Sequence, residues 1–277
     1  MKFKNALLLI LMLLSPLANA TSTSHFKNIL IIIFENTDYD VALKQPYFQK
    51  LSKQGALLQN MTGMVHPSQG NYLALLGGDF FGVRNDKPVN LNQTNLIDLL
   101  ENSGYSWKGY MENYPGNCFQ GETSGRYVRK HNPFISYTNI SQNPSRCAKI
   151  QDYETFKQDA ANNNLPNFSI LSPNLNDDGH DTGAAFASKW LQQNFENLLN
   201  DSNFLQDNLV VITFDESGNS AGNHIYTVLL GGAVQAGVRS NQPMNHVGLL
   251  KTVETEFNLG NLGRLDATAA PLNDIWK

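Results

Sequence analysis

The sequence predicts one α/β domain with a mostly parallel central sheet and helices on both faces. Continuous β-branched apolar runs occur along the chain, as in strands that are buried on both faces. Helical patterns alternate with these runs, which is typical of parallel sheets. The chain has 277 residues, of which 41% are hydrophobic, and this is enough for a large core. We expect residues 21–277 to form a single domain.

The apolar runs give the expected strands, and the amphipathic segments between them give the expected helices. The expected strands are residues 28–34 (NILIIIF), 105–111, 167–171, 208–214 (NLVVITF) and 225–230 (IYTVLL). The expected helices are residues 46–54, 71–76, 94–102, 153–161, 184–199 and 247–257. Ligands of such sheets bind beyond the carboxyl ends of the strands, so the residues that follow each run are the candidates for chemistry.

The first 20 residues have the pattern of a secretory signal peptide. Lys2 and Lys4 precede an apolar run over residues 6–14, and Ala18 and Ala20 are small residues at the cleavage positions. We expect cleavage after Ala20 and a secreted or periplasmic protein. The alternative, a membrane anchor, would need a longer apolar run, and the later sequence predicts no transmembrane segment.

Charge and cysteine content narrow the class of protein further. Lys and Arg total 20 against 24 Asp and Glu, for a net charge of −4, and this acidic balance argues against a nucleic-acid partner. Cys118 and Cys147 are expected to form one disulfide in an exported chain, with two buried free thiols as the alternative. We expect a monomer.

Acidic residues follow three of the expected strands. Glu35 and Asn36 follow the first run, Asp215 and Glu216 follow the run at 208–214, and residues 174–181 (NLNDDGHD) follow the run at 167–171. Buried carboxylates are costly unless they are paired or bind a cation. The three clusters therefore predict one divalent metal ion, with Mg²⁺, Ca²⁺ or Mn²⁺ suited to oxygen ligands and Zn²⁺ left open. Taken singly, each acid could instead cap a helix or pair with a lysine.

A second candidate is the segment HPSQGN at residues 66–71. Ser68 precedes a helical pattern, and the N–H groups and dipole of a helix N-terminus favour an anion such as phosphate. The alternative is that Ser68 simply caps the helix. Five histidines lie in loops beside expected elements, where acids and bases of α/β sites are found: His66, His131, His180, His224 and His246.

These segments together resemble the bacterial and fungal phosphoesterase family, within the alkaline phosphatase-like superfamily. The matching segments, in chain order, are FENTDYD (34–40), HPSQGNYLALLGG (66–78), KHNPF (130–134), SPNLNDDGHD (172–181), VVITFDES (210–217), NHIYTVLLGG (223–232) and NHVGLLKTVE (245–254). The family holds acid phosphatases and phosphocholine-preferring phospholipases C. This chain is most similar to its short secreted acid phosphatases, which include a phosphatidylinositol-3-phosphate phosphatase.

The resemblance implies a role for each matching residue. It implies that Ser68 is the nucleophile and that His131 and His180 contact the phosphate or protonate the leaving group. It implies four metal ligands: Glu35, Asn36, Asp215 and Glu216. Five further residues are expected to bind substrate: His66, Asn71, Lys130, Asn132 and Asp181. It leaves a second metal, and the roles of His224 and His246, open.

The resulting expectation is a secreted, metal-dependent acid phosphatase that hydrolyses phosphate monoesters through a phosphoserine intermediate. A membrane phosphoinositide is among its candidate substrates. His180, steadied by Asp177, Asp178 or Asp181, is expected to protonate the leaving alcohol, which favours activity at acidic pH. The alternatives are a phosphodiesterase of phospholipase C type and a non-catalytic exported protein whose acidic site holds a structural cation.

Overall fold

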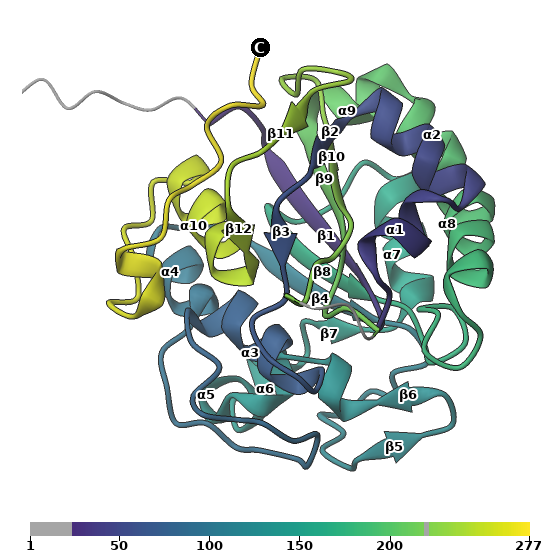
Figure 1. Cartoon of the computed structure of the whole chain (residues 1–277). Coiled ribbons are helices and arrows are strands. Elements are labelled where there is room, and N and C mark those ends of the chain that lie inside the picture. Colours follow the sequence, from purple (N-terminus) through teal and green to yellow (C-terminus); the bar gives the residue numbers. More distant parts are fainter. Residues whose placement is uncertain (1–23, 219–221) are drawn as a thin grey trace, which may run out of the picture.

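The computed structural model describes residues 24–218 and 222–277, and the expected signal peptide lies outside the described residues. Its main feature is an eight-stranded sheet in the order β11-β2-β10-β9-β1-β8-β4-β7 (Figure 1). The strands of this sheet are β1 (Asn28–Phe34), β2 (Ala56–Leu58), β4 (Trp107–Met111), β7 (Ile150–Gln151), β8 (Phe168–Ser172), β9 (Asn208–Phe214), β10 (Thr227–Leu230) and β11 (Arg239–Ser240). Two small sheets pair β3 (Met61–Thr62) with β12 (Met244–Asn245), and β5 (Thr123–Ser124) with β6 (Tyr127–Val128).

Strand β1 lies near the middle of the sheet and pairs in parallel with both β9 and β8. Its residues after Asn28 are buried, as expected for an apolar β-branched strand with both faces covered. Strand β10 is the exception, because it runs antiparallel to β9 and to β2. It follows β9 with no helix in the described part of the connection, and a parallel neighbour would need a crossover. The prediction of a mostly parallel sheet is confirmed.

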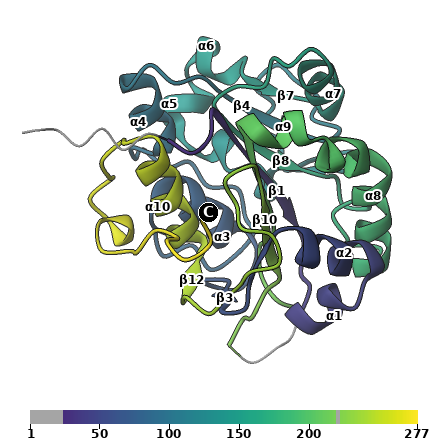
Figure 2. The same ribbon diagram turned by 90° about the horizontal axis from the view of Figure 1, so that it is seen from above.

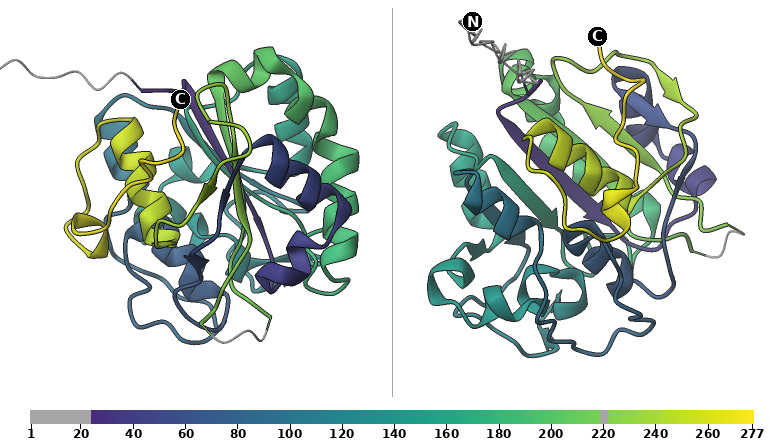
Figure 3. Two further views of the ribbon diagram at one scale, coloured as in Figure 1. Left: turned by 45° about the horizontal axis from the view of Figure 1, so that its top comes forward. Right: turned by 90° about the vertical axis from the view of Figure 1, so that its left-hand side faces the viewer.

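Helices cover both faces of the sheet, as predicted. The α-helices are α1 (Tyr39–Leu43), α2 (Pro46–Gln54), α3 (Gln69–Gly77), α4 (Leu96–Asn102), α5 (Thr138–Ser141), α6 (Pro144–Cys147), α7 (Tyr153–Ala161), α8 (Ala184–Asn200), α9 (Ser202–Asp207) and α10 (His246–Glu256). Three 3₁₀ turns are η1 (Arg129–His131), η2 (Phe134–Ser136) and η3 (Leu265–Ala267). Helices α3, α4 and α10 lie on one face, and α1, α2, α7, α8 and α9 lie on the other (Figure 2). Helix α10 runs across the first face (Figure 3, right).

Two further predictions can be compared with the structure. Cys118 and Cys147 form a disulfide with a Cα–Cα distance of 5.6 Å, as expected. Within residues 24–218 and 222–277, no helix has both the length and the apolar character needed to cross a membrane.

Because β1, β8 and β9 are parallel, their carboxyl ends meet at one edge of the sheet. The loops that follow them are therefore brought together there.

Candidate functional site

Ser68 lies at this edge, directly before α3. Its side chain is buried and makes no capping hydrogen bond to α3. The alternative that Ser68 only caps this helix is therefore not supported. Its Oγ instead donates to Oε2 of Glu35, at 3.0 Å. The same Oγ lies 3.4 Å from Oδ1 of Asn36 and 3.4 Å from Oε1 of Glu216. The loops after β1 and β9 thus both reach the serine that precedes α3.

Asn36 joins the two acidic loops. Its φ of 29° places it in the left-handed region, which Asn tolerates better than most residues. Its backbone N–H donates to Oδ1 of Asp215 at 3.1 Å, and its Nδ2 donates to Oε1 of Glu216 at 3.1 Å. The structure therefore places all four expected metal ligands beside Ser68.

The three carboxyl groups of this cluster are almost fully buried, with exposed fractions of 0% for Glu35, 1% for Asp215 and 2% for Glu216. Burial, together with the charges of Glu35 and Glu216, raises the pKa of Asp215 well above its usual value. Burial and the charge of Glu35 raise the pKa of Glu216 to about 7. The cluster therefore holds more negative charge than its surroundings offset.

The donor set of this cluster fits a hard divalent cation. Within the described part of the chain, no three His, Cys, Asp or Glu side chains are grouped as a ready-made metal site. However, Asp215 has a buried oxygen, Oδ2, without a hydrogen-bond donor among residues 24–218 and 222–277. Three carboxylates and the Asn36 amide oxygen supply the hard oxygen ligands that Mg²⁺, Ca²⁺ or Mn²⁺ prefer. A cation here would offset the repulsion that raises these pKa values.

His131, at the end of η1, pairs with two carboxylates. Its Nε2 lies 3.1 Å from Oε1 of Glu35 and its Nδ1 lies 3.2 Å from Oδ2 of Asp178. Burial lowers the pKa of His131, but Glu35 and Asp178 outweigh it and raise the pKa to about 9. Burial likewise raises the pKa of Glu35, but the charge and hydrogen bond of His131 and a hydrogen bond from Tyr72 bring it to about 2. His131 and Glu35 thus form a buried ion pair.

His180 is more accessible, with 33% of its side chain exposed. Its Nδ1 lies 2.8 Å from Oδ1 of Asp181, and its backbone N–H donates to Oδ1 of Asp178 at 2.8 Å. Its ring centroid is 6.1 Å from that of His131. Of the three acids considered as its partners, Asp181 and Asp178 contact His180, whereas Asp177 accepts a hydrogen bond from Asn174.

His66 and Lys130 lie at the rim of the cluster. Nδ1 of His66 is 2.7 Å from Oε2 of Glu216, and 52% of the His66 side chain is exposed. Nζ of Lys130 donates to Oδ2 of Asp86 at 2.9 Å. Asp86 also accepts a hydrogen bond from the backbone N–H of Gln69, the first residue of α3, at 3.1 Å. Lys130 is thus tethered beside the helix N-terminus that Ser68 precedes.

Two of the expected substrate-binding residues use their amide groups inside the loops. Oδ1 of Asn71 accepts from the N–H groups of Met64 and Val65, and its Nδ2 donates to the Val65 carbonyl. Nδ2 of Asn132 donates to the Tyr127 hydroxyl at 3.1 Å. The Asn71 contacts hold the backbone of residues 64 and 65, whereas the Asn132 contact joins two side chains.

His224 and His246 also contact backbone carbonyls. Nε2 of His224 is 3.1 Å from the Gln59 carbonyl, and its ring stacks on Tyr39. Nε2 of His246 is 3.1 Å from the carbonyl of Phe214, the last residue of β9. Burial lowers the pKa of His246 to about 4, so the ring is neutral at physiological pH. These contacts give both rings a packing role near the site.

Sequence reasoning missed Tyr72 and Asp86. The Tyr72 hydroxyl donates to Oε1 of Glu35 at 2.6 Å, and its ring stacks on His131 with centroids 5.4 Å apart. Tyr72 follows Ser68 by four residues, a spacing that places both on one helix face and could have indicated it. Asp86 lies in the long connection between α3 and α4, where periodicity gives no signal.

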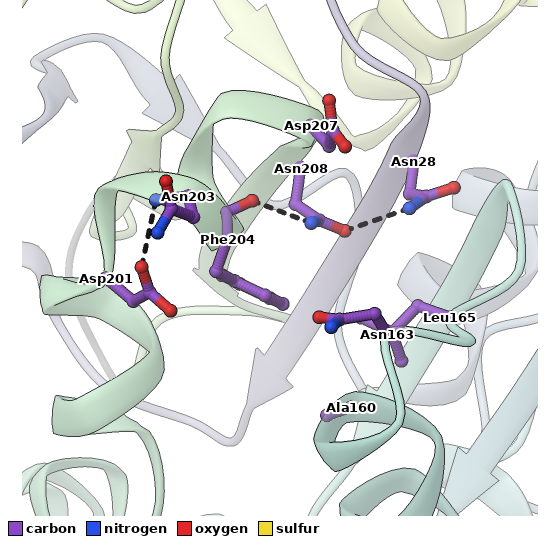
Figure 4. Close-up of a pocket in the computed structure, with 9 residues that line it drawn as sticks. All are labelled: Asn28, Ala160, Asn163, Leu165, Asp201, Asn203, Phe204, Asp207 and Asn208. Carbon is purple, nitrogen blue, oxygen red and sulfur yellow. Dashed lines mark hydrogen bonds between the residues drawn. The ribbon is translucent and has the colours of Figure 1, made fainter.

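A separate hollow of about 450 Å³ lies at the opposite edge of the sheet, by the first residues of β1 and β9 (Figure 4). Two of its asparagines are hydrogen-bonded within the wall: Nδ2 of Asn28 donates to Oδ1 of Asn208, whose Nδ2 donates to the Phe204 carbonyl. Asp207, also on its wall, pairs with Lys27. The described residues that line this hollow include no serine, threonine, cysteine or histidine, so the Ser68 cluster is the better candidate for catalysis.

Comparison with known sequences gives consistent matches. The model of the Phosphoesterase family matches residues 41–260. A "probable acid phosphatase" from Kluyveromyces lactis is 39% identical over 90% of this chain and 62% of its own length. A phosphatidylinositol-3-phosphatase from Mycobacterium tuberculosis is 30% identical over 93% of this chain and 85% of its own length. The chain spans only 60–64% of the length of the fungal acid phosphatases it matches.

Comparison with solved structures supports the fold. A protein of the alkaline phosphatase superfamily from Vibrio parahaemolyticus superposes with a TM-score of 0.63, covering 91% of this chain and 71% of its own. The sequence identity is 13%, so this likeness concerns the arrangement of strands and helices alone.

Proposed function

The chain belongs to the Phosphoesterase family, and on that basis we propose that it is a metal-dependent acid phosphatase. It hydrolyses phosphate monoesters through a phosphoserine intermediate on Ser68. The observation that carries this proposal is the position of the Ser68 hydroxyl, which is 3.0 Å from Glu35 and 3.4 Å from both Asn36 and Glu216. A buried serine that precedes a helix and faces a carboxylate cluster is suited to phosphoryl transfer.

In the first step, Ser68 Oγ attacks phosphorus while the bond from phosphorus to the alcohol oxygen breaks. The hydroxyl proton passes to water, because the two carboxylates that approach Oγ, Glu35 and Glu216, are assigned to the cation. The first N–H groups of α3 and the ammonium of Lys130 supply positive charge for the phosphate oxygens. Glu35, Asn36, Asp215 and Glu216 would hold a divalent cation, which when bound supplies charge neutralisation and favours the ionised serine.

The leaving alcohol needs a proton, and we assign the role of proton donor to His180. Asp181 accepts from Nδ1 at 2.8 Å, which fixes the ring and leaves the proton for transfer on the opposite nitrogen. His131 is held between Glu35 and Asp178 and instead positions the carboxylate that faces Ser68. In the second step, water attacks phosphorus, the bond to Ser68 Oγ breaks, and phosphate and the free serine are released.

Phosphoinositide monoesters are among the proposed substrates, because the Mycobacterium tuberculosis relative is named for phosphatidylinositol 3-phosphate and shares 30% identity over 93% of this chain. Export is also proposed, since the Cys118–Cys147 disulfide is typical of oxidising compartments.

The test is turnover of a chromogenic phosphate monoester by the wild type and by Ser68→Ala. We expect the variant to lose at least ~10³-fold in kcat, as expected for loss of a nucleophile, and the wild type to lose activity when chelator removes its metal. Ser52→Ala, at a buried serine of α2 whose hydroxyl bonds to the Gln49 carbonyl, is the matched control and should retain activity. A phosphate diester measured in parallel separates a phosphatase from a phosphodiesterase. A near-normal rate for Ser68→Ala would refute the nucleophile.

A further inference from the structure

Residues 85–87 fold back over the start of α3, close to Ser68. Gln69, which is almost fully buried, holds this segment through its Nε2, which donates to the carbonyls of Asn85 at 3.0 Å and Lys87 at 2.8 Å. The backbone N–H of Gln69 donates to Oδ1 of Asp86 at 3.1 Å. Three hydrogen bonds from one residue therefore fix a carboxylate next to the serine.

The other oxygen of this carboxylate binds a cationic group. Oδ2 of Asp86 accepts from Nζ of Lys130 at 2.9 Å, and both side chains are partly exposed, at 30% for Asp86 and 19% for Lys130. Both lie on the wall of a hollow of about 210 Å³. The Asp86 carboxylate thus bridges the Gln69 N–H at the start of α3 and the Lys130 ammonium, and the hollow lies beside this bridge.

An N–H at a helix start and a lysine ammonium are typical phosphate-binding groups. Here the N–H belongs to the residue that follows Ser68, so a phosphoryl group on Ser68 would lie beside it. Asp86 also adds a negative charge to a site that already holds Glu35, Asp215 and Glu216. A phosphate dianion at Ser68 is therefore repelled by the Asp86 carboxylate. The same carboxylate occupies two groups that would otherwise donate to the phosphate, the Gln69 N–H and the Lys130 ammonium.

We propose that Asp86 is a built-in competitor of phosphate. Its carboxylate occupies the Gln69 N–H and the Lys130 ammonium, and substrate phosphate displaces it from both. Asp86 thereby lowers the affinity of the site for phosphate monoesters and for inorganic phosphate, which favours release of the product. This inference rests on the proposed function, because it takes the phosphate site to be the one beside Ser68.

The test measures binding of inorganic phosphate to the full chain by calorimetry, for the wild type, Asp86→Asn and Asp86→Ala. We expect both variants to bind phosphate about tenfold more tightly, the size of effect that follows from removing one repulsive charge contact. KM for a phosphate monoester should fall in parallel. Asp79→Asn is the matched control: its Oδ1 accepts from the Phe81 N–H in the same connection, and its phosphate affinity should stay at the wild-type value.

Other outcomes are equally decisive. Unchanged or weaker phosphate binding in Asp86→Asn would overturn the proposal and make Asp86 a residue that only orients Lys130. Should Asp86→Ala fail to fold, the isosteric Asp86→Asn gives the answer alone. Tighter phosphate binding without turnover by the wild type would refute the phosphatase while leaving the competition intact. If the wild type hydrolyses the monoester but the Asp86 variants bind phosphate with wild-type affinity, the phosphatase stands and the competition by Asp86 is refuted.

Discussion

At the scale of single residues, the site depends on contacts between distant parts of the chain. Glu35 contacts Ser68, Tyr72 and His131, which follow it by 33, 37 and 96 residues. Each contact satisfies part of a buried carboxylate, whose charge would be costly without them. The position of Glu35 is therefore set jointly by α3 and η1.

Tyr72 gives a direct test of this dependence. Tyr72→Phe removes the hydroxyl that donates to Glu35 at 2.6 Å and keeps the ring that stacks on His131. Hydrogen bonds to charged groups contribute about 1.5–3 kcal/mol, so we expect kcat/KM to fall by tenfold or more. Steady-state kinetics on a monoester measures this. Tyr47→Phe is the control, since the buried Tyr47 hydroxyl has no hydrogen-bond partner among the described residues. Equal rates for wild type and Tyr72→Phe would contradict the role.

The candidate ligands could be predicted from sequence because each directly follows an apolar strand. Glu35 and Asp215 follow β1 and β9, whose pairing in register from Asn28 with Asn208 brings their ends together. The partners of His131 could not be predicted, because Glu35 and Asp178 come from the loops after β1 and β8, and Tyr72 comes from α3. Asn71 was expected to bind substrate because it lies close to Ser68 in the sequence. Nothing in the sequence indicates that its amide instead bonds to the backbone of residues 64 and 65.

At the scale of elements, periodicity predicted the long segments closely. The expected helices at 46–54 and 153–161 coincide with α2 and α7, whereas α3 begins two residues earlier than expected, at Gln69. The two- and three-residue strands, such as β2 and β11, are too short for a pattern to show. The antiparallel direction of β10 also escaped prediction, because a buried apolar run reads the same in either direction.

The Cys118–Cys147 disulfide closes the segment that carries Lys130 and His131. Its cysteines are 29 residues apart, and a crosslink of that span stabilises by about 3.5 kcal/mol in the chain-entropy account. We therefore expect Cys118→Ser/Cys147→Ser to melt several degrees lower than the wild type in thermal unfolding followed by circular dichroism. Reductant should lower the wild-type melting temperature toward that of the variant and leave the variant unaffected. Equal melting temperatures of the two oxidised proteins would show that the crosslink contributes no stability.

At the scale of the whole molecule, buried carboxyl groups with raised pKa values occur both in the Ser68 cluster and elsewhere in the fold. Outside the Ser68 cluster, Glu112 and Glu254 are carboxyl groups whose pKa is raised to about 8, chiefly by burial. Glu112 follows β4 and accepts from the Asn174 N–H, while Glu254 lies on α10 across the sheet. A folded state that retains protons which the unfolded chain loses becomes less stable as pH rises. The molecule should thus be more stable under acidic conditions than at pH 8.

Glu254 offers the cleaner measurement because it lies outside the site. Its side chain is 1% exposed, and burial together with the nearby Asp266 carboxyl raises its pKa, against a contact at 3.1 Å with Lys251. Below about pH 4.5 both states are protonated; between there and pH 8 only the unfolded state ionises, so stability falls. Glu254→Gln cannot ionise, and we expect it to gain on the order of 2 kcal/mol at pH 8 and nothing at pH 4.

Thermal unfolding from pH 4 to pH 9 measures this difference. The melting temperature of Glu254→Gln should match the wild type at pH 4 and exceed it by several degrees at pH 8. Glu154→Gln is the matched control, because Glu154 on α7 is 67% exposed and its variant should follow the wild-type curve at every pH. If the two glutamine variants behave alike, the buried carboxyl of α10 already ionises in the folded protein, and the pH dependence of stability must come from Glu112 and the groups around Ser68.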